Sequence, residues 1–379
     1  MKIFIVTERR ADFSRFKPIL KIIKQEKKLK YDLVVTGLHL VREYGYTIKE
    51  ILDENFKVYE KFSMFNKNYF LRNDGSSMAN SLGIAINKLS KILRKSKPDV
   101  ILSGFDIAAN FAVTLCGAHM NIPVAHIQGG EVSGTIDESL RHGMSKFSNI
   151  HFTANSETKR RLIKMGEIKK NIYPVGCPSI DALMDEDVVS QKYILKKFKI
   201  DILKPYSITI QHPVTSELNL SELQMKKTVN ALKKVDMQHL IIFPNNDAGS
   251  KKILNIIKKS NLNHTPTLNL AEYKTLLKNG KILIGNSSSG IHEASTFKIP
   301  VINIGTRQNG RMQPRNIINT THNEIQIYKA IRKGLSTKFN KSIKNIKNPY
   351  GKGNSSHQII KILKKINFQN FNTQKKITY

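Results

Sequence analysis

The side chains best suited to proton transfer lie in one stretch, residues 128–142. Together with His126 just before it, this stretch holds three glycines, three acidic residues, two histidines and an arginine. Proton transfer needs an acid and a base that reach the same substrate atom, and glycines give the backbone the freedom to bring them there. The pattern favours an active-site loop over the alternative, an ordinary solvated loop. Its candidate side chains are Gln128, Glu131, Asp137, Arg141 and His142.

A second stretch, residues 285–293, has residue types that bind phosphate. It follows the apolar run 282–284, so a buried strand should lead through a Gly- and Ser-rich turn into a helix start. Such a turn aims backbone N–H groups and hydroxyls at one point, which suits a diphosphate, and Glu293 could accept hydrogen bonds from a ribose. Simple helix capping by serine is the alternative. The candidate ligands are Ser287, Ser288, Ser289 and Glu293.

Short apolar runs recur along the chain, and each ends in a polar segment. They predict buried parallel strands at 2–7, 33–37, 100–104, 124–127, 150–154, 206–211, 240–243, 281–284 and 301–304. Ligands of such sheets bind outside the carboxyl ends of the strands. Polar residues that follow the strands therefore become candidates: Arg10, His39, Asp106, His212, Asn246, Arg307 and Arg311. For Asp106, a catalytic role and a helix N-cap for residues 107–117 are equally open.

A chain of 379 residues is too long for one core and fits two α/β domains. We predict an α/β fold of two Rossmann-like lobes that face each other across a cleft. The first lobe should span residues 1–183, the second 184–350, and residues 351–379 should form a C-terminal helix, at 355–366, and a tail. We expect the helix to pack back on the first lobe, the tail from Asn367 to fray, and residues 62–77 to form a mobile loop before a helix at 78–93.

Composition narrows the functional classes. The formal charge of +33 is spread along the chain, without aromatic residues between the lysines, which argues against a nucleic-acid partner. No uninterrupted apolar run of about 18 residues could span a bilayer, and the start lacks the features of a secretory signal, so we expect a cytoplasmic protein without membrane contact. Cys116 and Cys177 lack metal-ligand spacing, which predicts buried free thiols and no structural metal.

Several ordered motifs resemble those of one family, the hydrolysing UDP-N-acetylglucosamine 2-epimerases of sialic-acid-type biosynthesis, within the two-lobed fold of type B glycosyltransferases. The likeness covers nearly the whole chain and rests on residues 10–12, 36–40, 129–137, 141–142, 212–215, 244–250, 285–289 and 305–311. It implies removal of UDP from UDP-N-acetylglucosamine with release of N-acetylmannosamine, through loss of the C2 proton, a 2-acetamidoglycal and water addition with inversion at C2. No redox cofactor is implied, and we expect a homodimer or homotetramer.

By matching position, the resemblance implies acid/base roles for Asp106, Asp137 and His212, with Glu131 as a further candidate. It implies that the UDP is held by Arg10, Ser287, Ser288, Ser289, Glu293, Arg307 and Arg311. His39, Gln128, Arg141, His142 and Asn246 join the predicted substrate-binding set because they lie in the matching motifs.

Two positions depart from the family pattern. Members commonly have Gly-Asp-Arg where this chain has Phe105-Asp106-Ile107, and several carry glutamate at Gln128. Glutamine cannot take a proton at neutral pH, so either Glu131, Asp137 or His212 takes over that duty or the sugar differs. The same reaction on UDP-2,4-diacetamido-2,4,6-trideoxyglucose is therefore the close alternative. A glycosyltransferase of this fold and a nucleotide-sugar-binding regulator without turnover are less favoured.

Overall fold

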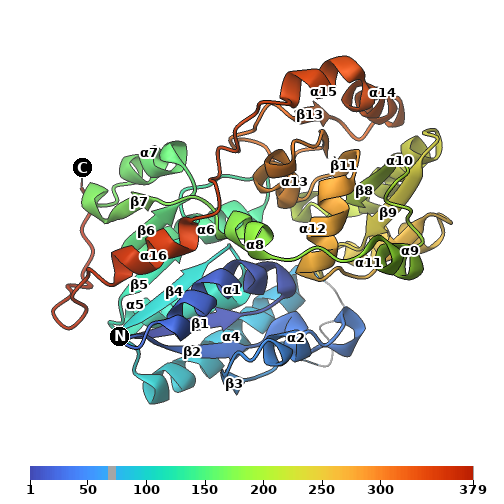
Figure 1. The fold of residues 1–379 in the computed structure, drawn as a ribbon. Coiled ribbons are helices and arrows are strands. Elements are labelled where there is room, and N and C mark those ends of the chain that lie inside the picture. Colours follow the sequence, from blue (N-terminus) through green and yellow to red (C-terminus); the bar gives the residue numbers. More distant parts are fainter. Residues whose placement is uncertain (67–73, 379) are drawn as a thin grey trace.

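The computed structural model describes residues 1–66 and 74–378, which form two parallel β-sheets with helices on both faces (Figure 1). The first sheet has the strand order β3-β2-β1-β4-β5-β6-β7 and the second the order β10-β9-β8-β11-β12-β13. The strands are β1 (Lys2–Thr7), β2 (Lys30–Val35), β3 (Val58–Lys61), β4 (Val100–Gly104), β5 (Val124–Ile127), β6 (Ile150–Thr153), β7 (Ile172–Pro174), β8 (Tyr206–Ile210), β9 (Gln238–Ile242), β10 (Asn263–Thr265), β11 (Ile282–Gly285), β12 (Val301–Ile304) and β13 (Ile317–Thr320). The predicted pair of Rossmann-like lobes is confirmed.

Helices connect the strands and cover the sheets. They are α1 (Arg10–Gln25), α2 (Ile48–Asp53), α4 (Gly75–Ser96), α5 (Ala108–His119), α6 (Ile136–Phe147), α7 (Ser156–Lys164), α8 (Pro178–Asp185), α9 (Gln191–Phe198), α10 (Ser221–Lys233), α11 (Ser250–Lys258), α12 (Leu270–Asn279), α13 (Ser288–His292), α14 (Glu324–Leu335), α15 (Thr337–Ile343) and α16 (Ser355–Leu363). No helix in the described part of the chain is long and apolar enough to cross a membrane.

Alternating side chains of β1 build the two halves of the first core. Ile3 and Ile5 pack with residues of α1 and α16, whereas Phe4 and Val6 pack with residues of α4 and α5 on the opposite face. This two-sided burial explains why β1 is an unbroken apolar run. Both cysteines are free and buried, as predicted.

The strand order reverses between β1 and β4 in the first sheet and between β8 and β11 in the second. In open α/β sheets ligands bind at such switch points, outside the carboxyl ends of the strands. Two loops of the first lobe, at 8–9 and 105–107, and two of the second, at 211–214 and 286–287, are therefore placed at a possible site.

The C-terminal helix packs back on the first lobe, as predicted, because Ile359, Ile360 and Leu363 of α16 are fully or almost fully buried in its core (Figure 1). The prediction that the tail frays stays a prediction, but one contact near its end was not expected. Lys375 Nζ lies 2.5 Å from Glu167 Oε2 and 2.8 Å from the carbonyl oxygen of Ser145. A buried carboxylate at Glu167, which the sequence did not reveal, holds the end of the chain.

Some predicted bounds also shift. The first helix begins at Arg10, within the predicted loop, because the carboxylate of Asp12 accepts hydrogen bonds from the backbone N–H groups of Glu8 and Arg9. Of the predicted loop at 62–77, residues 67–73 lie outside the described residues, and the helix after it begins at Gly75, where Asp74 caps it.

Candidate active site

Two neighbouring cavities lie between the lobes. The first, of about 500 Å³, contains two acidic residues of the predicted active-site loop, Glu131 and Asp137, and the second, of about 490 Å³, contains the serine-rich turn. We call them the acidic cavity and the serine cavity. Six residues line both: Arg9, Ala11, Arg15, Asn245, Ser288 and Arg307. We call this shared region the junction, and three of its six side chains are cationic.

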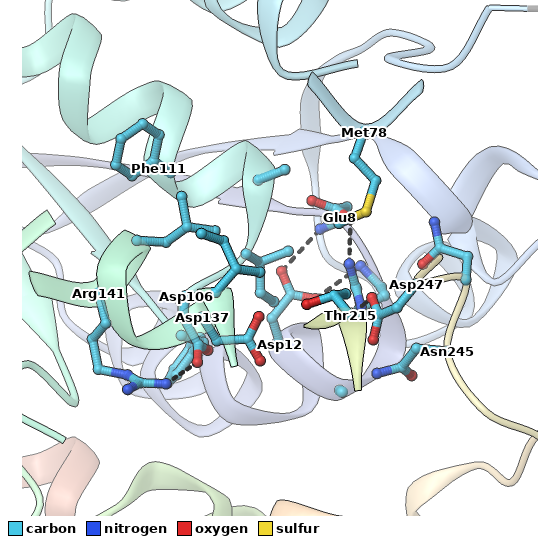
Figure 2. Close-up of a pocket in the computed structure, with 18 of the residues that line it drawn as sticks. Glu8, Asp12, Met78, Asp106, Phe111, Asp137, Arg141, Thr215, Asn245 and Asp247 are labelled. Atoms are coloured by element: carbon cyan, nitrogen blue, oxygen red, sulfur yellow. Dashed lines mark hydrogen bonds and ion pairs between the residues drawn. The ribbon is translucent and has the colours of Figure 1, made fainter. Parts of the chain in front are cut away.

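Asp106 and Asp137 both line the acidic cavity (Figure 2). Asp106 follows β4 and is paired with Arg141 of α6, while Asp137, in the first turn of α6, has its Oδ2 atom 3.5 Å from Nη2 of Arg307. The acidic cavity therefore holds two ion pairs. One lies within the first lobe, and the other links α6 to an arginine of the second lobe.

The pKa values of the two carboxyl groups are shifted in opposite directions. Burial by itself would raise the pKa of Asp106, but Arg141, helped by Arg311 and Arg15, holds that pKa below its ordinary value. Burial raises the pKa of Asp137, the negative charge of Asp106 raises it further, and Arg307 opposes both effects. Carboxyl groups whose pKa values are pushed apart in one cavity are suited to separate acid and base roles.

Asp106 does not cap the following helix. α5 begins after Ile107 without a side-chain cap, and the backbone N–H of Ala109 donates instead to Glu8 Oε2 at 3.0 Å. Asp106 has a backbone φ of 44° and Phe105 one of 70°, in the left-handed region that such residues rarely adopt. A role as the N-cap of α5 is thus excluded for Asp106. Its side chain, paired with Arg141, lines the cavity instead.

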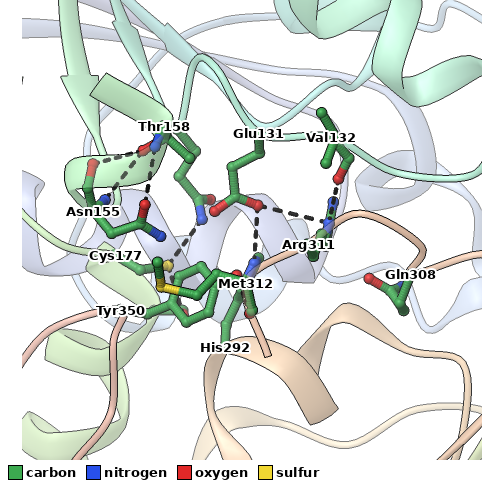
Figure 3. A network of polar contacts seen from close by, with 12 residues as sticks. Glu131, Val132, Asn155, Thr158, Cys177, His292, Gln308, Arg311, Met312 and Tyr350 are labelled. Carbon is green, nitrogen blue, oxygen red and sulfur yellow. Dashed lines mark hydrogen bonds and ion pairs between the residues drawn. The ribbon is translucent and has the colours of Figure 1, made fainter. Parts of the chain in front are cut away.

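Glu131 lies in a buried polar network (Figure 3). Its Oε2 atom lies 3.1 Å from His292 Nε2 and 3.7 Å from Arg311 Nε. Burial would raise the pKa of Glu131, but His292 and Arg311 lower it to about 2. A carboxylate that stays ionised at neutral pH cannot donate a proton, so the geometry favours Glu131 as the residue that positions Arg311.

Gly134 brings this loop against the second lobe. Its backbone N–H donates to the carbonyl oxygen of Arg307 at 3.0 Å, and a Cβ at this position would lie 2.2 Å from the carbonyl oxygen of Thr306. Only glycine permits this approach. Arg311 Nε adds a second bridge, to the carbonyl oxygen of Val132 at 2.9 Å.

His212 is buried after β8 and lines the serine cavity, not the acidic one. Its Nδ1 atom accepts the backbone N–H of Asn245 at 3.1 Å, so the ring proton is on Nε2. Burial first, and then Arg307 and Arg9, hold its pKa well below the ordinary value. His212 is therefore a neutral imidazole that can donate one hydrogen bond.

The serine-rich turn lies where predicted, after β11. Ser287 is the N-cap of the short helix α13, and its Oγ accepts the backbone N–H of Ser289 at 3.3 Å. Ser288 Oγ has no part in this cap. Burial raises the pKa of Glu293 at the far end of α13, while Arg15 opposes the rise. Arg10 reaches across the cleft from α1, with Nη1 donating to Thr267 Oγ1 at 2.7 Å.

The structure brings most of the predicted site residues into the two cavities. The acidic cavity contains Asp106, Gln128, Glu131, Asp137, Arg141, Asn246 and Arg311; the serine cavity contains Arg10, His212, Ser287, Ser289 and Glu293; and the junction contains Ser288 and Arg307.

His39 and His142, which we expected to bind substrate, line neither cavity. His39 is fully buried between the hydroxyls of Thr7 and Thr47, at 3.0 and 2.6 Å, so its two ring nitrogens are already occupied. His142 Nε2 instead lies 3.4 Å from Glu138, one helical turn away on α6. The structure thus places both residues outside the two cavities, and their contact with substrate stays a prediction.

Sequence reasoning left five charged residues of the acidic cavity without a role in the site: Glu8, Arg9, Asp12, Arg15 and Asp247. Arg9 Nη2 pairs with Glu8 Oε1 at 2.6 Å, and burial raises the pKa of Asp12 to about 6. All except Asp247 lie within the first turns of α1 or just before it, where helical spacing turns several side chains to one side. Their position after the first strand of a parallel sheet was the available signal.

The sequence resembles one family of known proteins along most of its length. The family model described as UDP-N-acetylglucosamine 2-epimerase matches residues 21–364. The UDP-N,N'-diacetylbacillosamine 2-epimerase (hydrolyzing) of Legionella pneumophila is 33% identical over 370 residues, covering 96% of each chain. The UDP-N-acetylglucosamine 2-epimerase of Neisseria meningitidis serogroup B is 34% identical over 338 residues, covering 88% of each.

Among solved structures, a UDP-GlcNAc 2-epimerase from Neisseria meningitidis bound to UDP-GlcNAc superposes with a TM-score of 0.79 at 19% identity. It covers 97% of this chain and 100% of that one. A Staphylococcus aureus protein in complex with UDP gives a TM-score of 0.80 at 18% identity, covering 100% of this chain and 99% of that one. These likenesses establish the two-lobed fold of type B glycosyltransferases.

Proposed function

This chain belongs to the UDP-N-acetylglucosamine 2-epimerase family, and we propose that it is a hydrolysing member that removes UDP from a UDP-2-acetamido sugar with inversion at C2. The observation that carries the proposal is the pair of carboxylates in the acidic cavity, Asp106 and Asp137, whose pKa values are pushed in opposite directions. The relatives from Legionella and, with 31% identity, Campylobacter jejuni bear names that include hydrolysis.

In the first half-reaction, the ionised carboxylate of Asp106 takes the C2 proton. The electrons of the C–H bond form the C1–C2 double bond, and the C1–O bond to UDP breaks, giving the 2-acetamidoglycal and UDP. Arg141 suits this role for Asp106, because it keeps the carboxylate ionised and fixes its orientation.

In the second half-reaction, water adds to C1 and the protonated carboxyl of Asp137 gives its proton to C2 from the opposite face. The proton lost by the water passes to solvent, and the two carboxyl groups exchange protons with solvent to return to their starting states. The raised pKa of Asp137 supports a proton donor at this position.

We place the diphosphate at the junction, between the sugar in the acidic cavity and the uridine in the serine cavity. Ser288 and Arg307 line both cavities and offer the hydroxyl and guanidinium donors that phosphate oxygens accept. Neutral His212, from the serine cavity, could donate its Nε2 proton to the departing phosphate.

The acidic cavity favours the diacetamido-trideoxy sugar over N-acetylglucosamine. Part of its wall is apolar: Met64, Met78, Leu82, Ile107, Phe111, Ile136, Leu140 and Leu218. Met78 and Phe111 are labelled in Figure 2. A 6-deoxy sugar would present a methyl group that this wall can cover, whereas a 6-hydroxyl buried against it without a partner would cost about 1 to 3 kcal/mol. Ile107, at the position of the family's arginine, is part of this wall. The name of the Legionella relative agrees with this choice.

UDP-N-acetylglucosamine is the second candidate, because the Neisseria relative, equally similar in sequence, bears that substrate in its name. Incubation of the protein with each nucleotide sugar in deuterated water tests both. We expect free UDP and a manno-configured sugar with deuterium at C2, with kcat/KM about 10-fold or more higher for the diacetamido sugar. If neither nucleotide sugar gives a product with deuterium at C2, the proposed reaction is contradicted.

A further inference from the structure

We propose that Arg15 binds the diphosphate of the nucleotide sugar, and that Phe105 and Gln128 are positioning residues that hold its guanidinium at the junction without neutralising it. This inference rests on the proposed function and adds to it. It joins the two positions at which the sequence departs from the family pattern, because both contact the same arginine.

Arg15 lies on the second turn of α1 and lines both cavities. Its guanidinium carbon lies 5.0 Å from the centroid of the Phe105 ring, within the range of a cation–π contact. Phe105 is itself 2% exposed and packs edge-on against Phe16, with 5.0 Å between ring centroids. The ring is thus a fixed platform, and a glycine at position 105 would leave the guanidinium without it.

The second contact of Arg15 is a neutral one. Its Nη1 atom donates to Gln128 Oε1 at 3.1 Å, and the other end of that amide, Nε2, donates to Cys177 Sγ at 3.1 Å. The guanidinium offers only donors, so the amide oxygen must face it. Burial raises the pKa of Cys177 to about 11, so the sulfur is an uncharged thiol at neutral pH. No negative charge enters this chain of contacts.

The other two cations of the junction are already paired. Arg9 lies 2.6 Å from Glu8 and 3.9 Å from Asp247, and Arg307 lies 3.5 Å from Asp137. Arg15 alone of the three has no ion pair within the described residues. Its charge also acts over a longer range on Asp106 and Glu293, but no carboxylate of the described residues within ion-pair distance holds its N–H groups, which leaves them available to an occupant of the junction.

Glutamate at position 128 would place a carboxylate in hydrogen-bond contact with Arg15. The resulting ion pair would hold the fork of N–H donors and cancel much of the charge that a diphosphate needs. Glutamine keeps the position of the guanidinium and leaves its charge free. Phe105 and Gln128 thus both contact the Arg15 guanidinium without pairing it with a negative charge.

Calorimetric titration of the full-length protein with UDP tests the assignment, with UMP as the matched ligand that lacks the β-phosphate. We expect Arg15→Gln to weaken UDP binding about 10- to 100-fold, with a smaller loss for UMP and a reduced dependence of affinity on salt. The control is Arg42→Gln, which removes an exposed arginine outside both cavities and should leave UDP affinity within about 2-fold.

Two further variants test the positioning residues. Gln128→Glu should weaken UDP binding about 10-fold at pH 7.5. Phe105→Leu should weaken it about 3- to 10-fold, whereas Phe105→Tyr, which keeps an aromatic face, should restore it. In the background of Arg15→Gln the Phe105→Leu change should have no further effect on UDP affinity, a result that a purely structural role for Phe105 does not produce.

The outcomes separate this inference from the proposed function. If the wild-type protein turns over a UDP-sugar and Arg15→Gln binds UDP as well as wild type does, the assignment of Arg15 is wrong and the proposed function stands. Unchanged UDP affinity in Gln128→Glu would overturn the role of the neutral amide. If wild type binds neither UDP nor a UDP-sugar, the proposed function itself fails. Should Arg15→Gln not fold, Arg15→Lys keeps the charge, loses the fork and should bind UDP several-fold more weakly.

Discussion

Replacing Asp106 by asparagine should damage one half-reaction and spare the other. Asp106 is held ionised by Arg141, which suits it to take the C2 proton, while Asp137 keeps its raised pKa for the return of a proton. Asparagine fills the same space but cannot accept that proton. We expect Asp106→Asn to lower turnover of the nucleotide sugar by about 100-fold or more, a rise of about 2.7 kcal/mol in the activation barrier.

The structure also fixes the direction of a pH effect. The negative charge of Asp106 is one of the causes that raise the pKa of Asp137. In Asp106→Asn that charge is gone and Arg141 has lost its partner, so the pKa of Asp137 must fall. If protonated Asp137 is needed, activity is lost as pH rises through its pKa, and this limb of the pH profile should move to lower pH in the variant.

The assay uses two starting compounds. Release of UDP from the nucleotide sugar reports both halves, whereas hydration of added 2-acetamidoglycal reports only the second. At a pH below the lowered pKa of Asp137, we expect Asp106→Asn to retain most of the glycal hydration and nearly all of the UDP affinity, and Asp236→Asn, an exposed control, to behave as wild type. Full activity of Asp106→Asn, or an equal loss in both half-reactions, would refute the assignment of Asp106 as the C2 base.

Three other changes have expected outcomes. Ser288→Ala or Arg307→Ala should weaken UDP binding by about 1 to 3 kcal/mol. Unchanged titration curves for both variants would mean that the diphosphate lies elsewhere. His212→Ala should cut turnover by about 100-fold in an otherwise folded protein, and equal rates of variant and wild type on both the nucleotide sugar and the glycal would remove His212 from the mechanism. Lys375→Met should lower the free energy of unfolding in urea by about 1 to 3 kcal/mol, because Glu167 loses a partner. His151 and Lys375 lower the pKa of Glu167 from 4.5 to about 2 against the effect of burial, so this stabilisation is complete above pH 4.5 and is lost as pH falls toward 2. An identical unfolding midpoint for Lys375→Met and wild type at pH 7 would contradict this account.

The central strands could be predicted from the sequence, but the edge strands could not. All nine predicted strands exist, whereas β3, β7, β10 and β13, the outermost strands of the two sheets, were missed. A central strand such as β4 is buried on both faces and reads as an apolar run, while β3 and β10 have exposed residues and only three or four positions. Their place is set by pairing with a neighbour, which leaves little trace in the local pattern.

For the site, residue types were predictable and contacts were not. The spacing of the strands brought Asp106, Asp137 and Ser288 to the cleft, because strand ends share one edge of a sheet. His39 stands in an equivalent position after β2, yet it turns inward to two threonines. Nothing in the sequence showed that Glu8 caps α5 in place of Asp106, since the two residues are a hundred positions apart.

The way in which α16 completes the first lobe sets an order for folding during synthesis. Ile359, Ile360 and Leu363 are buried in the same core as Ile3 and Ile5, so the first lobe lacks part of its interior until α16 has been made. Burying three such side chains is worth about 5 to 9 kcal/mol, which is comparable to the whole stability of a typical domain. The two larger cores of the second lobe contain no residue of α16, so we expect the first lobe to reach its full stability last, although its strands are made first.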